Sequence, residues 1–192
     1  MYRHCAGILG ECPTLSHKLS HTVPQGVPLT ILIGIDPGPT TSGLVVYQLD
    51  ADGSGRVIRS QKDATLGDLR GVLDLVQGAE VVFERTQAGP PSTSVVKTTE
   101  VVGRLMEACE ARGLPWTAYY RRQVLQLLGC ARKGNKDALV RAACIELHGG
   151  HKQAAIGKKA SPGPLYGVSS HAWQALGVVC AHLLSRPPET AP

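Results

Sequence analysis

Three residues with metal-binding side chains stand at the ends of core segments of the sequence. Asp36 follows the apolar run 29–35, Glu84 follows the short run 80–83, and His171 opens the last apolar stretch. Carboxylates at the ends of neighbouring strands point into one shared space, and holding them together is costly unless a cation neutralises them. Cations held in this way can activate a water molecule and stabilise the leaving oxygen of a phosphodiester. The three residues therefore predict a site for metal-assisted hydrolysis.

Each of the three residues also has an ordinary structural interpretation. Asp36 precedes Pro37 and would suit a turn, Glu84 would simply end a strand, and His171 would be a residue of a first helical turn. The functional interpretation rests on their combination with a basic region. Between Arg112 and Lys159 the chain has ten basic and two acidic residues, so the rest of the chain is acidic on balance. Such asymmetry is typical of a surface that binds nucleic acid, although a solvated basic surface has the same composition.

The elements that must position these residues follow from hydrophobic patterning. Apolar runs predict strands over 29–35, 43–49, 56–60, 80–84 and 116–120. Apolar residues at helical spacing predict helices over 66–76, 95–109, 122–129 and 136–148, with a last helix from an N-cap at Ser170 to Leu184. We expect 149–169 to be an ordered loop with little regular structure. Three successive strands, followed by alternating helices and strands, predict an α/β fold with a mixed central sheet flanked by helices.

Composition limits the other possibilities. The 192 residues suffice for one domain, and we expect it over 29–186, between a poorly structured extension (1–28) and a short tail (187–192). No apolar run is long enough to span a membrane, and the first twelve residues do not have the pattern of a signal peptide. The extension contains two cysteines and two histidines that offer a weak alternative, a zinc site, although their spacing fits no standard finger. Its four residues are Cys5, Cys12, His17 and His21. The other four cysteines lie on apolar stretches and suggest buried free thiols in a reducing compartment, namely Cys109, Cys130, Cys144 and Cys180.

The segment Ile31-Leu-Ile-Gly-Ile-Asp36-Pro-Gly38 resembles the opening strand of the RuvC family of Holliday-junction resolvases, which have the RNase H-like fold. Further segments match in order: Val-Val-Phe-Glu84-Arg, the helix with Gly103-Arg-Leu-Met-Glu-Ala, the basic stretch 120–140, and the ending 162–176, which is similar to RuvC-like proteins of phages. The resemblance covers Leu29 to Leu184. It implies a metal-dependent, structure-selective endonuclease that resolves branched DNA by hydrolysing phosphodiester bonds, in the cytoplasm of a bacterium or a phage-infected host.

The same resemblance implies a role for each site residue. Asp36, Glu84 and His171 would ligate one or two Mg²⁺ or Mn²⁺ ions, and Gln174 would orient a metal-bound water. Lys136 would contact the scissile phosphate or its neighbour. The DNA backbone would be held by Arg121, Arg122, Arg132, Lys133, Lys136 and Arg141. The sequence departs from the family in its last helix, where the usual two aspartates at i and i+3 are His171 and Gln174.

Several alternatives remain open from the sequence. The loss of two carboxylates also fits a degenerate protein that binds DNA without cleaving it. The segment 34–43 is similar to the first phosphate loop of sugar kinases and chaperone ATPases, but 192 residues hold only one of the two lobes those proteins need. Unpaired bases would meet Tyr120, the loop 86–93 and Tyr119, unless Tyr119 is buried. Members of the family act as homodimers, and the apolar residues Val95, Val102 and Met106 would form the dimer interface or belong to the core.

Overall fold

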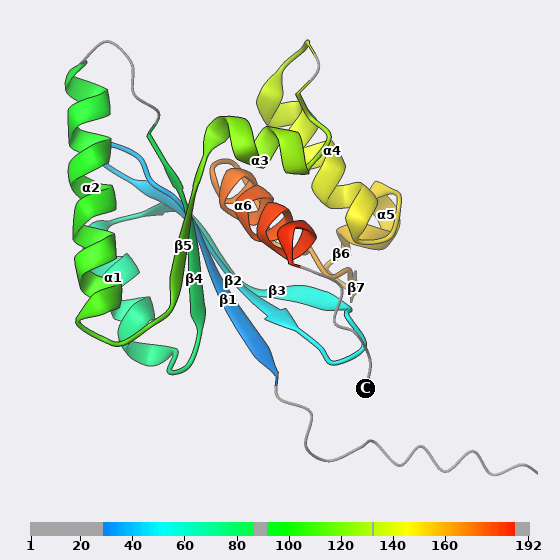
Figure 1. Cartoon of the computed structure of the whole chain (residues 1–192). Helices are drawn as coiled ribbons and strands as arrows, with labels where there is room; N and C mark the ends of the chain where they lie inside the picture. The colour runs from blue at the N-terminus through cyan, green and yellow to red at the C-terminus, as the bar shows by residue number, and fades with distance from the viewer. Residues whose placement is uncertain (1–28, 87–91, 132, 187–192) are drawn as a thin grey trace, which may run out of the picture.

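The computed structural model describes residues 29–86, 92–131 and 133–186, which form a five-stranded sheet with helices on both faces (Figure 1). The strand order is β3-β2-β1-β4-β5. The pairs β3–β2 and β2–β1 are antiparallel, whereas the pairs β1–β4 and β4–β5 are parallel. The strands are β1 (Thr30–Asp36), β2 (Ser42–Leu49), β3 (Gly55–Ala64), β4 (Glu80–Arg85) and β5 (Trp116–Tyr120). The predicted mixed α/β sheet is confirmed.

The helices divide between the two faces of the sheet (Figure 1). One face is covered by α1 (Leu66–Leu75) and α2 (Thr93–Glu110), and α6 (Ala172–Ser185) packs directly on the other face. Behind α6 lie α3 (Arg121–Leu127), α4 (Lys136–Leu147) and α5 (Lys152–Ala155). Each of the predicted helices is present, with ends that differ by a few residues.

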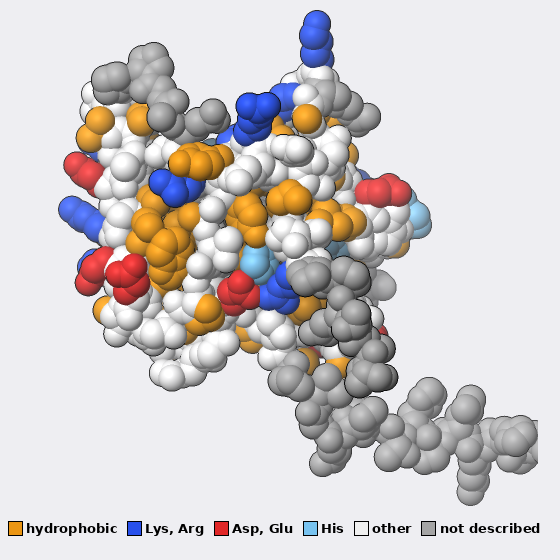
Figure 2. Space-filling view, in the orientation of Figure 1, with side chains coloured by type: hydrophobic (Ala, Val, Ile, Leu, Met, Phe, Trp, Pro, Cys, Tyr) orange, Lys and Arg blue, Asp and Glu red, His pale blue; other side chains and the backbone are white. Residues whose placement is uncertain are grey.

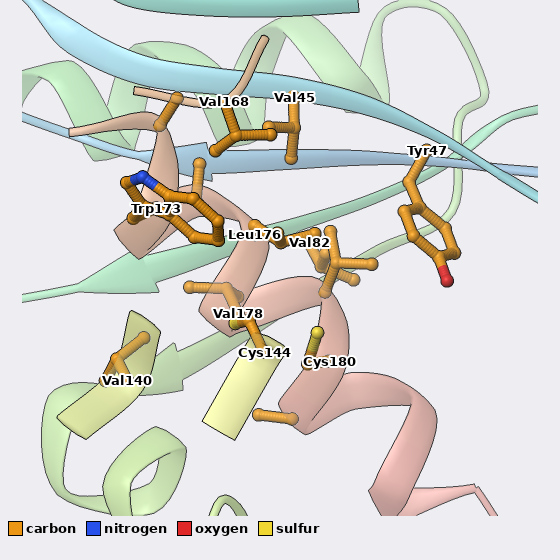
Figure 3. Close-up of a cluster of buried hydrophobic side chains, with 14 of the residues drawn as sticks. Val45, Tyr47, Val82, Val140, Cys144, Val168, Trp173, Leu176, Val178 and Cys180 are labelled. Atoms are coloured by element: carbon orange, nitrogen blue, oxygen red, sulfur yellow. The ribbon is translucent and has the colours of Figure 1, made fainter. Parts of the chain in front are cut away.

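The central strands are buried on both faces because successive side chains of a strand point to opposite sides. Leu32 and Val82 belong to the cluster beneath α6, part of which Figure 3 shows, whereas Ile33 and Phe83 pack against α1 and α2. Gly34 allows the close approach of α6. A Cβ at this position would lie 2.6 Å from the carbonyl oxygen of Ala175 and would clash with a Val179 methyl group. The carboxyl-terminal end of β1 is thereby held against the first half of α6.

The segment 149–169 has little regular structure, as predicted, whereas the predicted N-cap of α6 was wrong. The segment 149–169 contains α5 and a short antiparallel pair, β6 (Gly157–Lys158) and β7 (Ser161–Pro162), which glycines make possible. Gly157 has φ +68°, a conformation that disfavours other residues. The N-cap of α6 is His171 and not Ser170. Ser170 has φ +46° and so lies outside the extended region that an N-cap serine occupies.

The structure also decides between several open interpretations. Tyr119 is buried, and its hydroxyl bonds His182 Nδ1 at 2.8 Å. Val102 and Met106 pack into the core beneath α2. The cysteines at 109, 130, 144 and 180 are buried and no disulfide joins any two of them, as predicted. In the described part of the chain, no helix has the length and apolar character needed to cross a bilayer. The proposed extension and tail, including the four candidate zinc ligands, lie outside the described residues.

Candidate active site

The carboxylates of Asp36 and Glu84 lie at the carboxyl ends of two adjacent parallel strands. Ile35 of β1 pairs with Phe83 of β4, and each carboxylate residue follows immediately. Both side chains fall on the α6 face, since each lies two residues beyond a position on that face, Gly34 in β1 and Val82 in β4. The structure thus brings together the two acidic residues that the sequence singled out.

Burial and mutual repulsion act on this pair. The pKa of Asp36 is raised to about 7, first by burial and then by the negative charge of Glu84, while the positive charge of Arg121 opposes the rise. Burial also raises the pKa of Glu84, against the attraction of Arg121. Because a buried carboxylate prefers its neutral form unless a cation balances it, the pair favours a positive group between or beside its members.

Arg121 supplies such a positive group. Its Nη1 donates to Glu84 Oε2 at 3.1 Å and to Gln174 Oε1 at 2.7 Å, and its Nη2 donates to Asp137 Oδ1 at 2.7 Å. The guanidinium therefore connects the end of β4, the first turn of α4 and the start of α6. Its contacts in this structure are to protein side chains, whereas the sequence suggested a role on the DNA backbone.

Asp137 and the bridging position of Arg121 were missed by sequence reasoning. The available signal was topological: Arg121 directly follows β5, which lies beside β4, so its side chain starts from the same edge of the sheet as Glu84. Asp137 lies in the first turn of α4, where Asn135 caps the helix by accepting hydrogen bonds from the backbone N–H groups of Asp137 and Ala138. Nothing in the sequence indicated that this turn faces Arg121.

His171 and Gln174 approach the pair from α6. The backbone carbonyl of His171 lies so close to Gly43 that a Cβ there would clash, and Gly43 is the cross-strand partner of Asp36. The His171 side chain is exposed, and Gln174 is 8% exposed with its amide oxygen bonded to Arg121. Among the described residues, no three His, Cys, Asp or Glu side chains gather as one metal-binding group. The acidic pair is assembled here, but the predicted set of three ligands is not.

A groove beside α6 leads away from this cluster. It has a volume of about 390 Å³ and shares Gln174 and Asp137 with the bonds to Arg121. Arg141 forms part of its wall, with the guanidinium 5.0 Å from the centre of the Trp173 ring. A larger cavity of about 880 Å³, next to the β2–β3 hairpin, is lined by none of the predicted site residues.

Of the predicted DNA-binding residues, Arg141 lines this groove, and Lys136 immediately precedes Asp137, which also lines it. Arg122 follows Arg121 in α3 and is exposed, as is Lys133, whereas Lys136 is half-buried at the start of α4. Figure 2 shows Lys and Arg side chains gathered along the edge above α3 and the start of α4. Arg132 lies outside the described residues. The basic side chains of this region thus lie on α3, on α4 and in the loop between them, and one of them, Arg141, forms part of the groove wall.

The comparisons with known proteins agree with the motifs. No protein-family model matches the chain. Over 123 residues it is 29% identical to the crossover junction endodeoxyribonuclease RuvC of Xanthomonas euvesicatoria, an alignment that covers 57% of this chain and 69% of that protein.

Two solved structures of Thermus thermophilus RuvC have the same fold. One is a structure of the protein, with a TM-score of 0.57 at 22% identity, and the other is its complex with a Holliday junction substrate, with a TM-score of 0.55 at 21% identity. Each match covers 81% of this chain and 94% of the other. The RNase H-like fold is confirmed. In sequence and in fold, the chain is RuvC-like.

Proposed function

We propose that this chain is a metal-dependent endonuclease that cuts branched DNA by hydrolysing phosphodiester bonds. The observation that carries the proposal is the pair Asp36 and Glu84 in a RuvC-like fold. Two half-buried carboxylates are brought together at the ends of parallel strands, where burial raises the pKa of both and the charge of Glu84 further raises that of Asp36. A protein that keeps such a pair has a site suited to a cation.

The donor set fits a hard divalent cation such as Mg²⁺ or Mn²⁺, because carboxylate oxygens are the ligands these ions prefer. Asp36 and Glu84 would hold it. His171 is the candidate third ligand, because its backbone lies over Gly43, beside the end of β1. When bound, the ion supplies a more acidic water and a positive charge for the leaving oxygen of the phosphodiester.

The residues around the pair perform the other tasks. The half-buried position of Asp36 and Glu84 limits the access of bulk water, which strengthens the attraction of their charges for a cation. Lys136 begins α4 next to Asp137, and we assign it to a phosphate near the scissile bond. Arg122, Lys133 and Arg141 would position the backbone of the DNA along the groove, with contacts that carry no sequence information.

Branched DNA is proposed as the substrate because the RuvC of T. thermophilus has been solved with a Holliday junction. Such a junction presents two equivalent strands to be cut. A homodimer with two active sites would match that symmetry, so we propose a dimeric enzyme.

A second function is favoured by one observation. The family's second aspartate of the last helix is Gln174 here, and its oxygen is bonded to Arg121. A site with fewer acidic ligands binds a metal more weakly, so a protein that binds junctions without cutting them is the alternative.

One experiment decides between the two functions. The purified protein is incubated with a labelled four-way junction and with a linear duplex of the same sequence, in Mg²⁺ and in Mn²⁺. The proposal expects cleavage of the junction that depends on the metal and is absent from the Asp36→Asn variant. Retained junction binding without cleavage in either metal would instead establish the binding protein. Equal cleavage by the Asp36→Asn variant would show that the acidic pair is not the active site.

A further inference from the structure

Arg121 is bonded to three side chains beside the acidic pair, namely Glu84, Gln174 and Asp137. Its guanidinium donates to side-chain oxygens of three different elements at distances of 2.7 to 3.1 Å. The side chain is 27% exposed and its partner Glu84 is 17% exposed, so water screens this ion pair only partly. A bridge of this kind is fixed in direction, because a guanidinium offers its donors in a rigid plane.

The charges around Arg121 explain its position. Asp36, Glu84 and Asp137 are acidic, and Arg121 is the cation that attracts both Glu84 and Asp36. Gln174 offers an oxygen acceptor without a further negative charge. The guanidinium therefore sits beside the acidic pair with three hydrogen bonds, which makes it a competitor for the same carboxylate that a metal would bind.

We infer that Arg121 is a resident cation, which holds Glu84 in the metal-free protein and must release it before a divalent ion can bind. Gln174 and Asp137 are positioning residues that aim the guanidinium at Glu84. The inference rests on the proposed function, because it concerns the metal of that same site. In this inference Arg121 controls the affinity for the metal, whereas Arg122, Lys133 and Arg141 contact the DNA.

The release need not carry Arg121 far. Asp137 accepts from Nη2, whereas Glu84 and Gln174 share Nη1, so the bond to Asp137 and the bond to Glu84 use different nitrogens. Asp137 is exposed and lines the groove, and a guanidinium that keeps this bond while leaving Glu84 stays at the groove wall. There its charge faces the space that we assign to the DNA backbone.

The test measures metal binding in the absence of DNA. Mn²⁺ is titrated into metal-free protein, and bound ion is followed by electron paramagnetic resonance and calorimetry. We expect Arg121→Gln to bind Mn²⁺ about tenfold more tightly than the parent, since the ion no longer displaces a paired guanidinium. The matched control is Arg122→Gln, which removes the same charge from the next, exposed residue. It should change the affinity by about twofold at most, in line with a screened surface charge.

Two further variants keep the test decisive if Arg121→Gln does not fold. Gln174→Met removes one acceptor of the guanidinium, so the inference expects tighter Mn²⁺ binding. If Gln174 is itself a metal ligand, binding becomes weaker. Arg121→Lys keeps the charge but cannot make the same three bonds, and should give an affinity between those of the parent and Arg121→Gln. Circular dichroism spectra and melting curves establish which variants are folded.

The results distinguish the proposed metal site from the proposed role of Arg121. Equal affinities for Arg121→Gln and Arg122→Gln, or weaker binding by Arg121→Gln, would overturn the resident cation while leaving the metal site in place. Binding that Asp36→Asn abolishes would support the proposed site whatever Arg121 does. If neither the parent nor any variant binds Mn²⁺, both the proposed metal dependence and the inference fail.

Discussion

The backbone carbonyl of His171 lies directly over Gly43, where any larger residue would collide with it. Gly43 is the cross-strand partner of Asp36, so this contact sets the distance between the start of α6 and the acidic pair. The start of α6 has no side-chain cap that could hold it in place. The absence of a side chain at residue 43 therefore determines how closely His171 and Gln174 approach the carboxylates.

This contact predicts the effect of Gly43→Ala. The added methyl group would push the first turn of α6 away from β2 and should reduce junction cleavage by about tenfold or more, since small displacements of catalytic groups are costly. Crowding of a packed site should also lower the free energy of unfolding by about 1–3 kcal/mol. Cleavage assays and denaturant unfolding measure the two effects.

The control for this variant is Gly103→Ala in α2, where a Cβ meets no other atom within 4 Å. Replacing a helical glycine with alanine should leave cleavage unchanged and stabilise the protein by about 0.5–1 kcal/mol. If Gly43→Ala behaves in the same way, the approach of α6 is not set by Gly43.

Asp36→Asn should separate activity from stability. Cleavage should be lost while junction binding persists, because the proposed DNA contacts come from other residues.

The pKa of Asp36 is raised from 3.8 to about 7 in the folded protein, so between these pH values the folded state holds a proton that the unfolded state has released. The stability from this group is therefore lost as pH rises from about 4 to 7.

An asparagine avoids this loss of stability. In the absence of metal, Asp36→Asn should raise the melting temperature more at pH 8 than at pH 5, relative to the parent. Asp63→Asn, at an exposed position of β3, serves as the control. A melting temperature that falls by the same amount at both pH values would mean that Asp36 has a structural role.

His148 should make stability depend on pH in the opposite direction. Its Nδ1 donates to the carbonyl oxygen of Cys144 at 2.7 Å, so in the neutral ring Nε2 accepts from the Tyr47 hydroxyl at 2.8 Å. Burial lowers the pKa of His148 below 6.5. The folded state thus binds fewer protons than the unfolded state, and stability should fall as pH decreases below about 6.5.

The comparison of the parent with His148→Gln isolates this contribution. The variant should be less stable at pH 7.5, since two hydrogen bonds are weakened, but the difference should narrow at pH 5.5. Some fall should persist in the variant, because burial also lowers the pKa of His182. Urea unfolding at the two pH values measures the difference. An unchanged gap would show that His148 does not titrate in this range.

Much of the fold could be predicted because burial on both faces of a strand gives continuous apolar runs. The runs that end at Asp36 and Glu84 are of this kind, and their parallel pairing then follows from the crossover through α1. The contacts of Arg121 could not be predicted in this way. They depend on where α4 and α6 lie in space, and neither the spacing nor the periodicity of the sequence indicates that Asp137 and Gln174 both bond Arg121.

The N-cap of α6 also depends on a tertiary contact that the sequence pattern does not indicate. Serine is a favoured N-cap, and Ser170 immediately precedes the apolar stretch, so propensity pointed to it. The tight contact with Gly43 instead places His171 at the cap, and Ser170 adopts a positive φ to enter the turn. A tertiary contact thus decides which residue stands next to the acidic pair.

The proposed role of His171 as a metal ligand predicts how the cleavage rates of its variants depend on the choice of metal. If the imidazole completes the proposed site, His171→Ala should cut junctions far more slowly than the parent in both metals. Imidazole nitrogen suits Mn²⁺ better than Mg²⁺, whereas carboxylate oxygen suits both, so the parent should be more active in Mn²⁺. His171→Asp should retain activity and narrow the ratio of the Mn²⁺ rate to the Mg²⁺ rate.

The measurement is the initial cleavage rate against metal concentration for the parent and the two variants. His151→Ala is the matched control, since His151 is also an exposed N-cap histidine but lies at the start of α5. It should leave both rates and their ratio unchanged. If His171→Ala cuts as fast as the parent in Mg²⁺ and in Mn²⁺, His171 only begins α6. The acidic pair would then be completed by a group other than this imidazole.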